Sequence, residues 1–355
     1  MILSFTQAIL RATMSALLDS KVHVFGLGAE YPNGLDGTMG DLSKMFQGRV
    51  HDTPCSEAAV TGMAVGMAAM GLRPLVHHGR IEFALYGMDA LLTQAAKWSA
   101  MFGGGYPVPL TVRIAMGRQW GNGPQHTINA KGLFAMHGLK VVCPSTPQMA
   151  HDLLIAAVKD DNPVIYLEPR WLYKMRGTVG DICATDLGKA RIVRQGTDIT
   201  VVAVGDMVLE TLKAAKLVEH IVSVEVVDLV SVYPIDEETI LQSVEKTRSL
   251  LVCESSQYPY STASQVIASV GMECVYISMN ALTCPDYPCP TAPSLTRDYY
   301  PTRTTIANEI LSMFGKLHRF TRNETFEELN LPPTDNVDEF LTDSGLKVQV
   351  GGGDG

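Results

Sequence analysis

The chain has 355 residues, of which 46% are hydrophobic and 18% charged, and its formal net charge is -9 at neutral pH. This length and composition suit a globular protein of two domains with well-buried cores. The acidic balance argues against a nucleic acid or an anionic membrane as the main partner, because either would favour clustered Lys and Arg. No basic region precedes the apolar residues of the N-terminus, so we expect no signal peptide and a cytoplasmic location, or an organelle matrix after processing.

Short β-rich runs alternate with helical periodicity along the whole chain. In the first half, the runs predict strands at 22–25, 72–76, 110–114, 140–142 and 164–167 and helices at 88–101 and 150–159. A second series predicts strands at 198–204, 222–229 and 249–253, followed by a helix near 305–314. This alternation is typical of doubly wound α/β domains, in which helices cover both faces of a mostly parallel sheet.

The composition changes at three places and so divides the chain. We expect a first domain over 1–178, a polar, glycine-dotted linker with an edge strand over 179–195, and a second domain over 196–317. The proline-rich segment 284–290 should be an ordered loop, since proline fits neither a helix interior nor a central strand. The acidic residues 318–355 should form an extended or flexible tail, a candidate docking segment.

One carboxylate stands at the start of a helix built from small residues. Residues 52–57 read DTPCSE and are followed by a run rich in Ala, Gly and Met to residue 71. This pattern predicts a turn and then a closely packed helix that Ser56 or Thr53 can cap. Glu57 would lie in the first turn, where a negative charge complements the helix dipole. From these residues alone, that electrostatic role is sufficient.

Several blocks occur in an order that points to a known family. They include residues 52–57 (DTPCSE), 71–74 (GLRP), 125–126 (QH), 138–142 (GLKVV), 160–164 (DDNPV), 196–200 (GTDIT) and 225–229 (EVVDL). In this order they resemble the β subunit of thiamin-diphosphate-dependent 2-oxoacid dehydrogenases, the decarboxylating first component of pyruvate, branched-chain and acetoin dehydrogenase complexes. The resemblance covers about residues 4–316. It implies a pyrimidine-binding domain followed by a transketolase C-terminal-type domain.

The resemblance also implies roles for single residues. Glu57 would hydrogen-bond nitrogen N1′ of the cofactor's aminopyrimidine and promote the tautomer that removes the proton from the thiazolium carbon. Phe83 would stack on the pyrimidine, and His126 would lie near the substrate carboxylate. Cys55 and Gly79 would be further cofactor contacts. From the residues alone, Phe83 could equally be a core side chain and His126 a structural histidine.

Two segments depart from the family pattern. The turn after the first strand usually carries a glutamate thought to relay protons between paired sites, but residues 26–30 read GLGAE, which leaves Glu30 as a candidate substitute. His77, His78 and Arg80 precede Phe83, and two histidines and an arginine near the cofactor would favour an anionic or polar substrate. A solvated or interface cluster is the alternative.

The resemblance further implies a structural site for a monovalent cation, with potassium expected. The matching residues are Leu110, Ala157, Val158, Asp160 and Asn162. The run 160–163 could also be only a turn that ends a helix.

The signature of the diphosphate and Mg²⁺ site is Gly-Asp-Gly followed roughly 25–30 residues later by Asn. Gly-Asp-Gly occurs here at 353–355, where no asparagine follows. We therefore expect this chain to hold half an active site, with Mg²⁺ and the diphosphate held mainly by an α subunit in an α2β2 heterotetramer.

Taken together, these features predict a subunit that decarboxylates a small 2-oxoacid and passes the acyl unit to a lipoyl group on a partner acyltransferase. A split transketolase-like or carboligating enzyme, which transfers the unit to an aldehyde, is the nearest alternative, and His77, His78 and Arg80 favour it. A non-catalytic partner of an α chain is a third possibility. The presence of Glu57 argues against that role, because a structural partner would not require this carboxylate.

Overall fold

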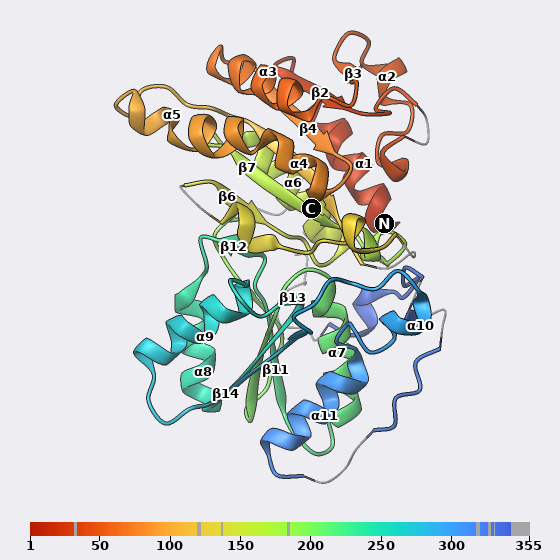
Figure 1. Cartoon of the computed structure of the whole chain (residues 1–355), viewed down its shortest axis with the longest axis vertical. Coiled ribbons are helices and arrows are strands. Elements are labelled where there is room, and N and C mark those ends of the chain that lie inside the picture. Colours follow the sequence, from red (N-terminus) through yellow and green to blue (C-terminus); the bar gives the residue numbers. More distant parts are fainter. Residues whose placement is uncertain are drawn as a thin grey trace, which may run out of the picture.

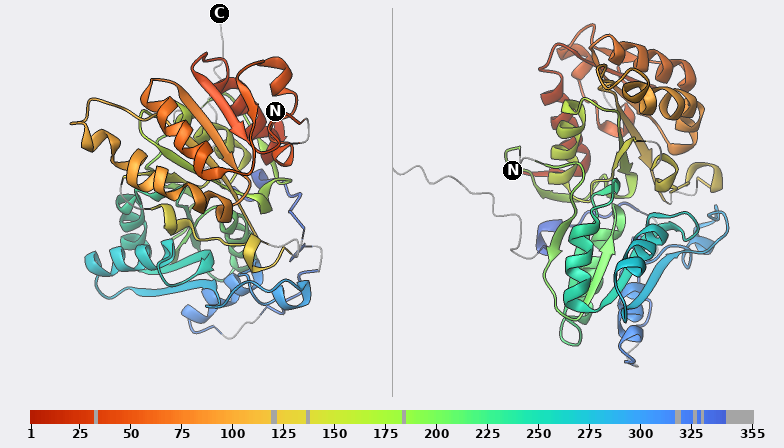
Figure 2. Two further views of the ribbon diagram at one scale, coloured as in Figure 1. Left: turned by 45° about the horizontal axis from the view of Figure 1, so that its top comes forward. Right: turned by 90° about the vertical axis from the view of Figure 1, so that its left-hand side faces the viewer.

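The computed structural model describes residues 1–31, 34–118, 122–135, 138–182, 185–316, 320–325, 328–329 and 331–341. Two α/β bodies lie one above the other along the longest axis, the first drawn in red to yellow-green and the second in green to blue (Figure 1). The turned views in Figure 2 show the same two bodies in contact.

The first body is built on a seven-stranded sheet with the order β12-β6-β7-β5-β4-β2-β3. Neighbouring strands from β6 to β3 run parallel, and β12 pairs antiparallel with β6. The strands are β2 (Val22–Gly26), β3 (Val50–Asp52), β4 (Arg73–His78), β5 (Thr111–Met116), β6 (Lys140–Val142), β7 (Val164–Pro169) and β12 (Ser231–Tyr233).

Helices cover both faces of this sheet, because successive strand residues point to opposite sides. In β4, Leu75 packs in one apolar cluster with α1 (Phe5–Ala16) and α6 (Pro147–Lys159). Its neighbour Val76 packs in a second cluster with α3 (Glu57–Ala69) and the π-helical segment Asp89–Ala95 that leads into α5 (Ala96–Met101). Both faces are therefore buried, as the apolar character of the strands predicts.

The second body repeats this plan on a five-stranded sheet with the order β14-β13-β10-β11-β9. The strands are β9 (Arg191–Arg194), β10 (Ile199–Ala203), β11 (Val224–Asp228), β13 (Ser249–Gln257) and β14 (Ser278–Cys284). One face packs on α7 (Asp206–Val218) and α11 (Arg303–Met313) and the other on α8 (Glu237–Thr247) and α9 (Thr262–Glu273). Each apolar cluster continues from one body into the other, so the two bodies share their cores.

Shorter elements complete the described chain. Strands β1 (Ile2–Ser4) and β8 (Arg176–Thr178) form an antiparallel pair. The short α-helices are α2 (Leu42–Met45), α4 (Ile81–Ala84) and α10 (Pro293–Thr296). Single 3-10 turns lie at Leu35–Gly37, Leu85–Gly87, Pro124–His126, Lys131–Phe134, Arg170–Leu172 and Val337–Glu339. Within the described residues, no helix has the length and apolar character needed to cross a membrane.

Every strand predicted from the sequence is present, and β6 has the predicted bounds. The prediction of two α/β domains with parallel sheets is confirmed. Strands β1, β3, β8, β12 and β14 were not predicted. The pairing of β12 with β6 is the most consequential of these, because a strand between β11 and α8 of the second body extends the sheet of the first.

The described end of the chain differs from the flexible tail expected from the sequence. Val337 is buried in the apolar cluster that contains α1, and the carboxylate of Asp338 accepts hydrogen bonds from the backbone N and the hydroxyl of Thr178 at 2.8 and 2.7 Å. Residues 331–341 therefore pack against β8 because an apolar side chain and a hydrogen-bonded carboxylate fix them there. Residues 342–355 lie outside the described part of the structure.

Candidate functional site

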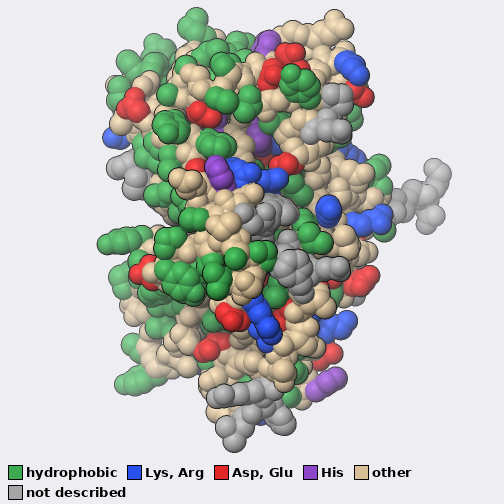
Figure 3. Space-filling view, turned by 45° about the vertical axis from the view of Figure 1, so that its right-hand side comes forward, with side chains coloured by type: hydrophobic (Ala, Val, Ile, Leu, Met, Phe, Trp, Pro, Cys, Tyr) green, Lys and Arg blue, Asp and Glu red, His purple; other side chains and the backbone are tan. Residues whose placement is uncertain are grey.

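The candidate residues gather at the carboxyl edge of the first sheet. Strands β3, β2, β4 and β5 are neighbours and run parallel, so the segments that follow them leave the sheet at the same edge. Glu57 follows β3, Arg80 follows β4, and His126 follows β5. Ligands of open α/β sheets bind at such edges. On the face shown in Figure 3, His, basic and acidic side chains gather near mid-height, toward the seam between the bodies.

Glu57 is the first residue of α3 and is half-buried. Within the described residues its carboxylate has no hydrogen bond or ion pair. Ser56 precedes the helix but makes no capping hydrogen bond with its side chain, so the cap expected there is not formed. One turn further along, the hydroxyl of Thr61 lies 3.0 Å from Nε2 of His78. Residues four apart share a helix face, which places Glu57 on the side of α3 that faces the end of β4.

Phe83 and His126 come together from different elements. Their rings meet edge to face with centroids 5.8 Å apart. Arg80 donates a hydrogen bond from Nη1 to the backbone oxygen of His126 at 3.0 Å, and the carboxylate of Glu82 accepts one from the backbone N of Ile128 at 2.9 Å. The residues at the start of α4 thus hold the loop that carries His126, whose imidazole is exposed.

The two residues predicted as further cofactor contacts lie in the turns before α3 and α4. Cys55 is an exposed thiol in the turn before α3. A Cβ atom on Gly79 would lie 4.0 Å from the ring of Phe83, so a small residue keeps one side of that ring open. Glu30 accepts a hydrogen bond from the backbone N of Asp52 at 3.1 Å and therefore contacts the end of β3.

Two of the three predicted substrate residues are covered by protein. Burial lowers the pKa of His78 to about 4, and burial together with Arg113 lowers the pKa of His77 well below its ordinary value. Both imidazoles are therefore neutral at neutral pH, and each is 4% exposed. Arg80 is half-buried. Burial and, after it, the nearby Arg170 lower the pKa of Arg80, yet its guanidinium stays charged at neutral pH.

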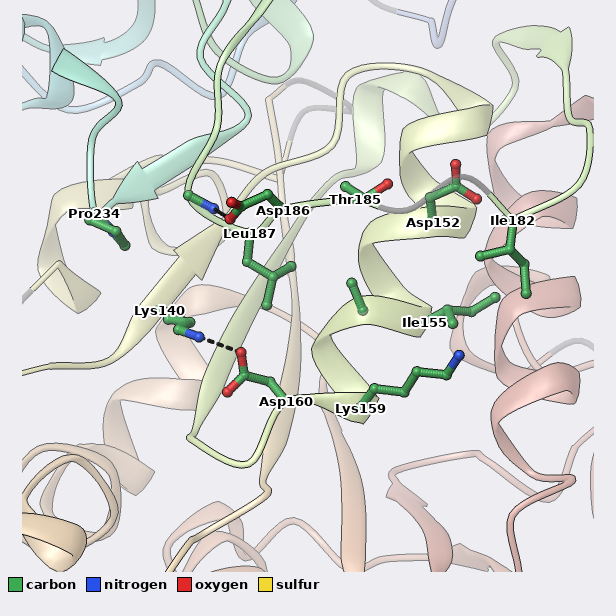
Figure 4. Close-up of a pocket in the computed structure, with 12 residues that line it drawn as sticks. Lys140, Asp152, Ile155, Lys159, Asp160, Ile182, Thr185, Asp186, Leu187 and Pro234 are labelled. Atoms are coloured by element: carbon green, nitrogen blue, oxygen red, sulfur yellow. Dashed lines mark hydrogen bonds and ion pairs between the residues drawn. The ribbon is translucent and has the colours of Figure 1, made fainter. Parts of the chain in front are cut away.

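The oxygens of the predicted potassium site are engaged by cations of this chain. Arg73 donates from Nη1 to the backbone oxygens of Val158 and Asp160, both at 3.0 Å. The Asp160 carboxylate forms an ion pair with Lys140, drawn at the edge of a surface groove of about 520 Å³ in Figure 4. Its other oxygen accepts from the backbone N of Asn162 at 2.8 Å. This network lowers the pKa of Asp160 despite its partial burial.

Two more of the predicted carbonyl ligands also have partners. The backbone oxygen of Leu110 accepts from Val164 N at 2.9 Å, and that of Ala157 accepts from Asp160 N at 3.2 Å. Two protein cations already stand beside these oxygens, so the described geometry does not fit a further cation. The potassium site stays a prediction of the family resemblance.

Sequence patterns missed the polar contacts between the two bodies. Lys131, which is fully buried, lies 3.6 Å from Glu254, and Asn129 donates to the hydroxyl of Ser255 at 2.6 Å. A cavity of about 520 Å³ opens beside these residues and the loop of His126. More than 120 residues separate the partners along the chain, so neither periodicity nor motif spacing could have paired them.

Comparison with known families follows the division into two bodies. Residues 5–176 match the transketolase pyrimidine-binding domain, and residues 188–306 match the transketolase C-terminal domain. A split-gene transketolase, solved as an inactive β4 tetramer, has the same fold with a TM-score of 0.72 at 18% identity, over 88% of this chain and 97% of that one. The fold and the matched domains define a transketolase-like protein, a class that uses thiamin diphosphate.

Two curated relatives show which family within this class the chain resembles. The chain is 39% identical to the pyruvate dehydrogenase E1 component subunit beta of Acholeplasma laidlawii, over 76% of this chain and 84% of that one. It is 37% identical to the acetoin:2,6-dichlorophenolindophenol oxidoreductase subunit beta of Bacillus subtilis, over 79% of this chain and 83% of that one. The chain belongs to the family of these dehydrogenase β subunits. The family predicted from the sequence is thus confirmed.

Proposed function

We propose that this chain is the β subunit of a thiamin-diphosphate-dependent 2-oxoacid dehydrogenase and that Glu57 activates the cofactor. The observation that carries the proposal is the Glu57 carboxylate, which is half-buried and without a partner among the described residues. This carboxylate can therefore accept a hydrogen bond from a bound ligand without breaking a contact within the described chain. A nitrogen of the cofactor would donate this hydrogen bond.

The residues at this edge fit the pyrimidine end of thiamin diphosphate. When bound, the cofactor supplies a carbon nucleophile that adds to the 2-oxo carbon and takes up the electron pair released with carbon dioxide. Glu57 would share a proton with ring nitrogen N1′, and the half-buried ring of Phe83 would lie against the pyrimidine. His126, exposed and fixed through its backbone by Arg80, would donate a hydrogen bond to the substrate carboxylate.

An α subunit would complete the site. The proposal rests on the diphosphate signature, because the Gly-Asp-Gly of this sequence, at 353–355, is not followed by an asparagine. A partner chain would then supply the Mg²⁺ and diphosphate contacts. The outer side of α3 is apolar, and Met63 and Met70 are 45% and 85% exposed. A Cβ atom on Gly62 or Gly66 would meet nothing within 4 Å, so another backbone could approach closely. This surface would face the α subunit in an α2β2 heterotetramer.

The acceptor of the acyl unit is proposed from the family, not from a residue of this chain. A lipoyl group on an acyltransferase is the proposed acceptor of the acyl unit derived from a small 2-oxoacid. The alternative is a carboligating enzyme with an aldehyde acceptor. Arg80 favours it, because its guanidinium is held at the backbone of His126 and a positive charge there would suit an anionic substrate.

Co-expression with an α-type subunit tests the proposal. The purified complex should bind thiamin diphosphate with Mg²⁺, decarboxylate one member of a panel of 2-oxoacids and lose activity with EDTA, while this chain alone should do none of these. Adding a lipoylated domain or an aldehyde to the same assay distinguishes the two acceptors. Tight binding of magnesium thiamin diphosphate by this chain alone would contradict the shared site. A complex that decarboxylates no 2-oxoacid would contradict the function.

A further inference from the structure

The loop that carries His126 is held from both bodies of the molecule. On one side, Arg80 and Glu82 hydrogen-bond the backbone at His126 and Ile128. On the other, Asn129 and Lys131 follow in the same loop and reach the second body. Asn129 lies three residues after His126, so the loop is fixed at the predicted catalytic residue and directly after it.

The contacts with the second body form a continuous buried relay. Lys131 donates from Nζ to Oδ1 of Asn129 at 2.8 Å, and Nδ2 of Asn129 donates to Oγ of Ser255 at 2.6 Å. The Ser255 hydroxyl donates in turn to Oδ1 of Asp206 at 2.8 Å. Nζ of Lys131 also lies 3.6 Å from Oε1 of Glu254. These five side chains are each at most 7% exposed.

The relay ends on a second buried cation. Nε of Arg118 lies 3.4 Å from Oδ2 of Asp206, and the guanidinium carbon lies 4.5 Å from the ring centroid of Trp171 and 5.3 Å from that of Tyr300. Two positive and two negative side chains, each at most 3% exposed, therefore lie together here. Such charges require their partners, since a single buried charge is strongly destabilising. Displacing the loop would move Lys131 away from Glu254, so these charges favour the observed position of the loop.

We propose that Lys131, Asn129 and Ser255 are positioning residues through which the second domain fixes the loop that carries His126. Glu254 and Ser255 lie in β13, and Asp206 begins α7 directly after β10, so the carboxyl edge of the second sheet supports the edge that carries the candidate site. The effect on turnover rests on the proposed function, whereas the effect on loop order does not. A misplacement of about 1 Å can cost roughly 100-fold in rate.

Ser255→Ala removes the central hydroxyl of the relay without leaving a charge unpaired, and Ser255→Thr retains it. In the complex with the α subunit, Ser255→Ala should increase hydrogen exchange of the amides at 122–135 and lower kcat at least tenfold, with KM and cofactor affinity little changed. Ser255→Thr should restore both the exchange rates and kcat.

Ser243→Ala is the matched control. Ser243 is a buried serine of the same domain that hydrogen-bonds Thr200 at 2.7 Å and Glu225 at 2.5 Å, away from the loop. It should lower the midpoint of thermal unfolding without changing loop exchange or kcat. Unchanged loop exchange and kcat in Ser255→Ala would overturn the inference, as would equal loop exchange in both alanine variants. If the wild-type complex turns over no 2-oxoacid, the proposed function fails, yet loop exchange still decides the positioning role.

Discussion

The carboxyl edges of the two sheets differ in what their polar groups do. At the first edge, Glu57 has no partner in the described chain, and the imidazole of His126 is exposed. At the second edge, Asp206 and Glu254 are buried and lie beside Arg118 and Lys131 of the first body. Both edges carry carboxylates at the ends of parallel strands, but those of the second are buried beside cations of the first body, whereas Glu57 is half-buried and has no cation beside it within the described residues.

This difference shows that a repeated fold need not repeat a site. The strand ends of the second body face protein, so each charge there needs a protein partner. Those of the first body face outward, and their unpaired groups can meet a cofactor and a second subunit. Substitutions at the first edge should therefore change activity with little effect on folding, and substitutions at the second should change stability first.

Glu57→Gln should have the largest effect. Proton transfer by a positioned side chain contributes about 10²–10⁴-fold to rate, so decarboxylation by the assembled complex should fall by that factor. The free energy of unfolding should hardly change, because Glu57 has no partner within the described residues. Steady-state assays and urea denaturation measure the two quantities. Glu245→Gln, at an exposed position of α8, is the control and should match the wild type in both.

Lys131→Met should have the largest effect on stability. It leaves the Glu254 carboxylate buried without its cation, which typically costs about 3–5 kcal/mol in the free energy of unfolding. Adding Glu254→Gln removes the stranded charge and should recover most of the loss. Urea denaturation of the single and double variants measures the coupling free energy between Lys131 and Glu254. A single variant as stable as the wild type would show that the seam tolerates an unpaired charge and would remove the contrast between the edges.

Asp228, at the end of β11 in the second sheet, provides a test of the comparison that depends on pH. Burial raises its pKa from 3.8 to about 6, although the hydroxyl of Ser145 donates a hydrogen bond to it across the seam. The folded chain therefore keeps a proton on Asp228 that the unfolded chain releases. The stabilisation of the folded state that results is present at about pH 4 and below and is lost as pH rises through 6. Between pH 4 and pH 7 the wild type should lose about 2 kcal/mol of unfolding free energy relative to Asp228→Asn. A difference independent of pH would refute the raised pKa.

Potassium should have the smallest effect. Arg73 and Lys140 already engage Val158 and Asp160, so replacing Na⁺ by K⁺ should shift the midpoint of thermal unfolding by less than about 2 °C. Differential scanning calorimetry in matched salts measures the shift. A larger rise that is specific to potassium and absent from Asp160→Asn would establish the cation site instead.

Local patterns in the sequence were enough for most elements. Buried strands such as β6 and β7 are short apolar runs, and α3 begins at Glu57, as the turn followed by small residues predicts. The capping role suggested for Ser56 could not be checked from sequence, because it depends on the side-chain direction at a single turn. The structure shows that this capping hydrogen bond is absent.

Long-range pairings could not be predicted in the same way. The three residues of β12 show too short a pattern to reveal that they join the sheet of the first body, and Val337 gives no local sign of its buried partners. Lys131 is a charged residue that composition alone would place on the surface. Only its distant partners explain its burial. The same holds for His77 and His78, whose adjacent positions suggested a binding cluster although both rings are covered.

The most direct test of the central claim follows the proton at C2 of thiamin diphosphate bound to the α–β complex. Hydrogen–deuterium exchange at this carbon, measured by quenched-flow NMR without substrate, reports cofactor activation alone. Glu57→Gln should slow the exchange at least about 100-fold, while Glu245→Gln should leave it unchanged. Equal exchange rates in the wild type and Glu57→Gln would contradict the assignment of Glu57 as the activating carboxylate.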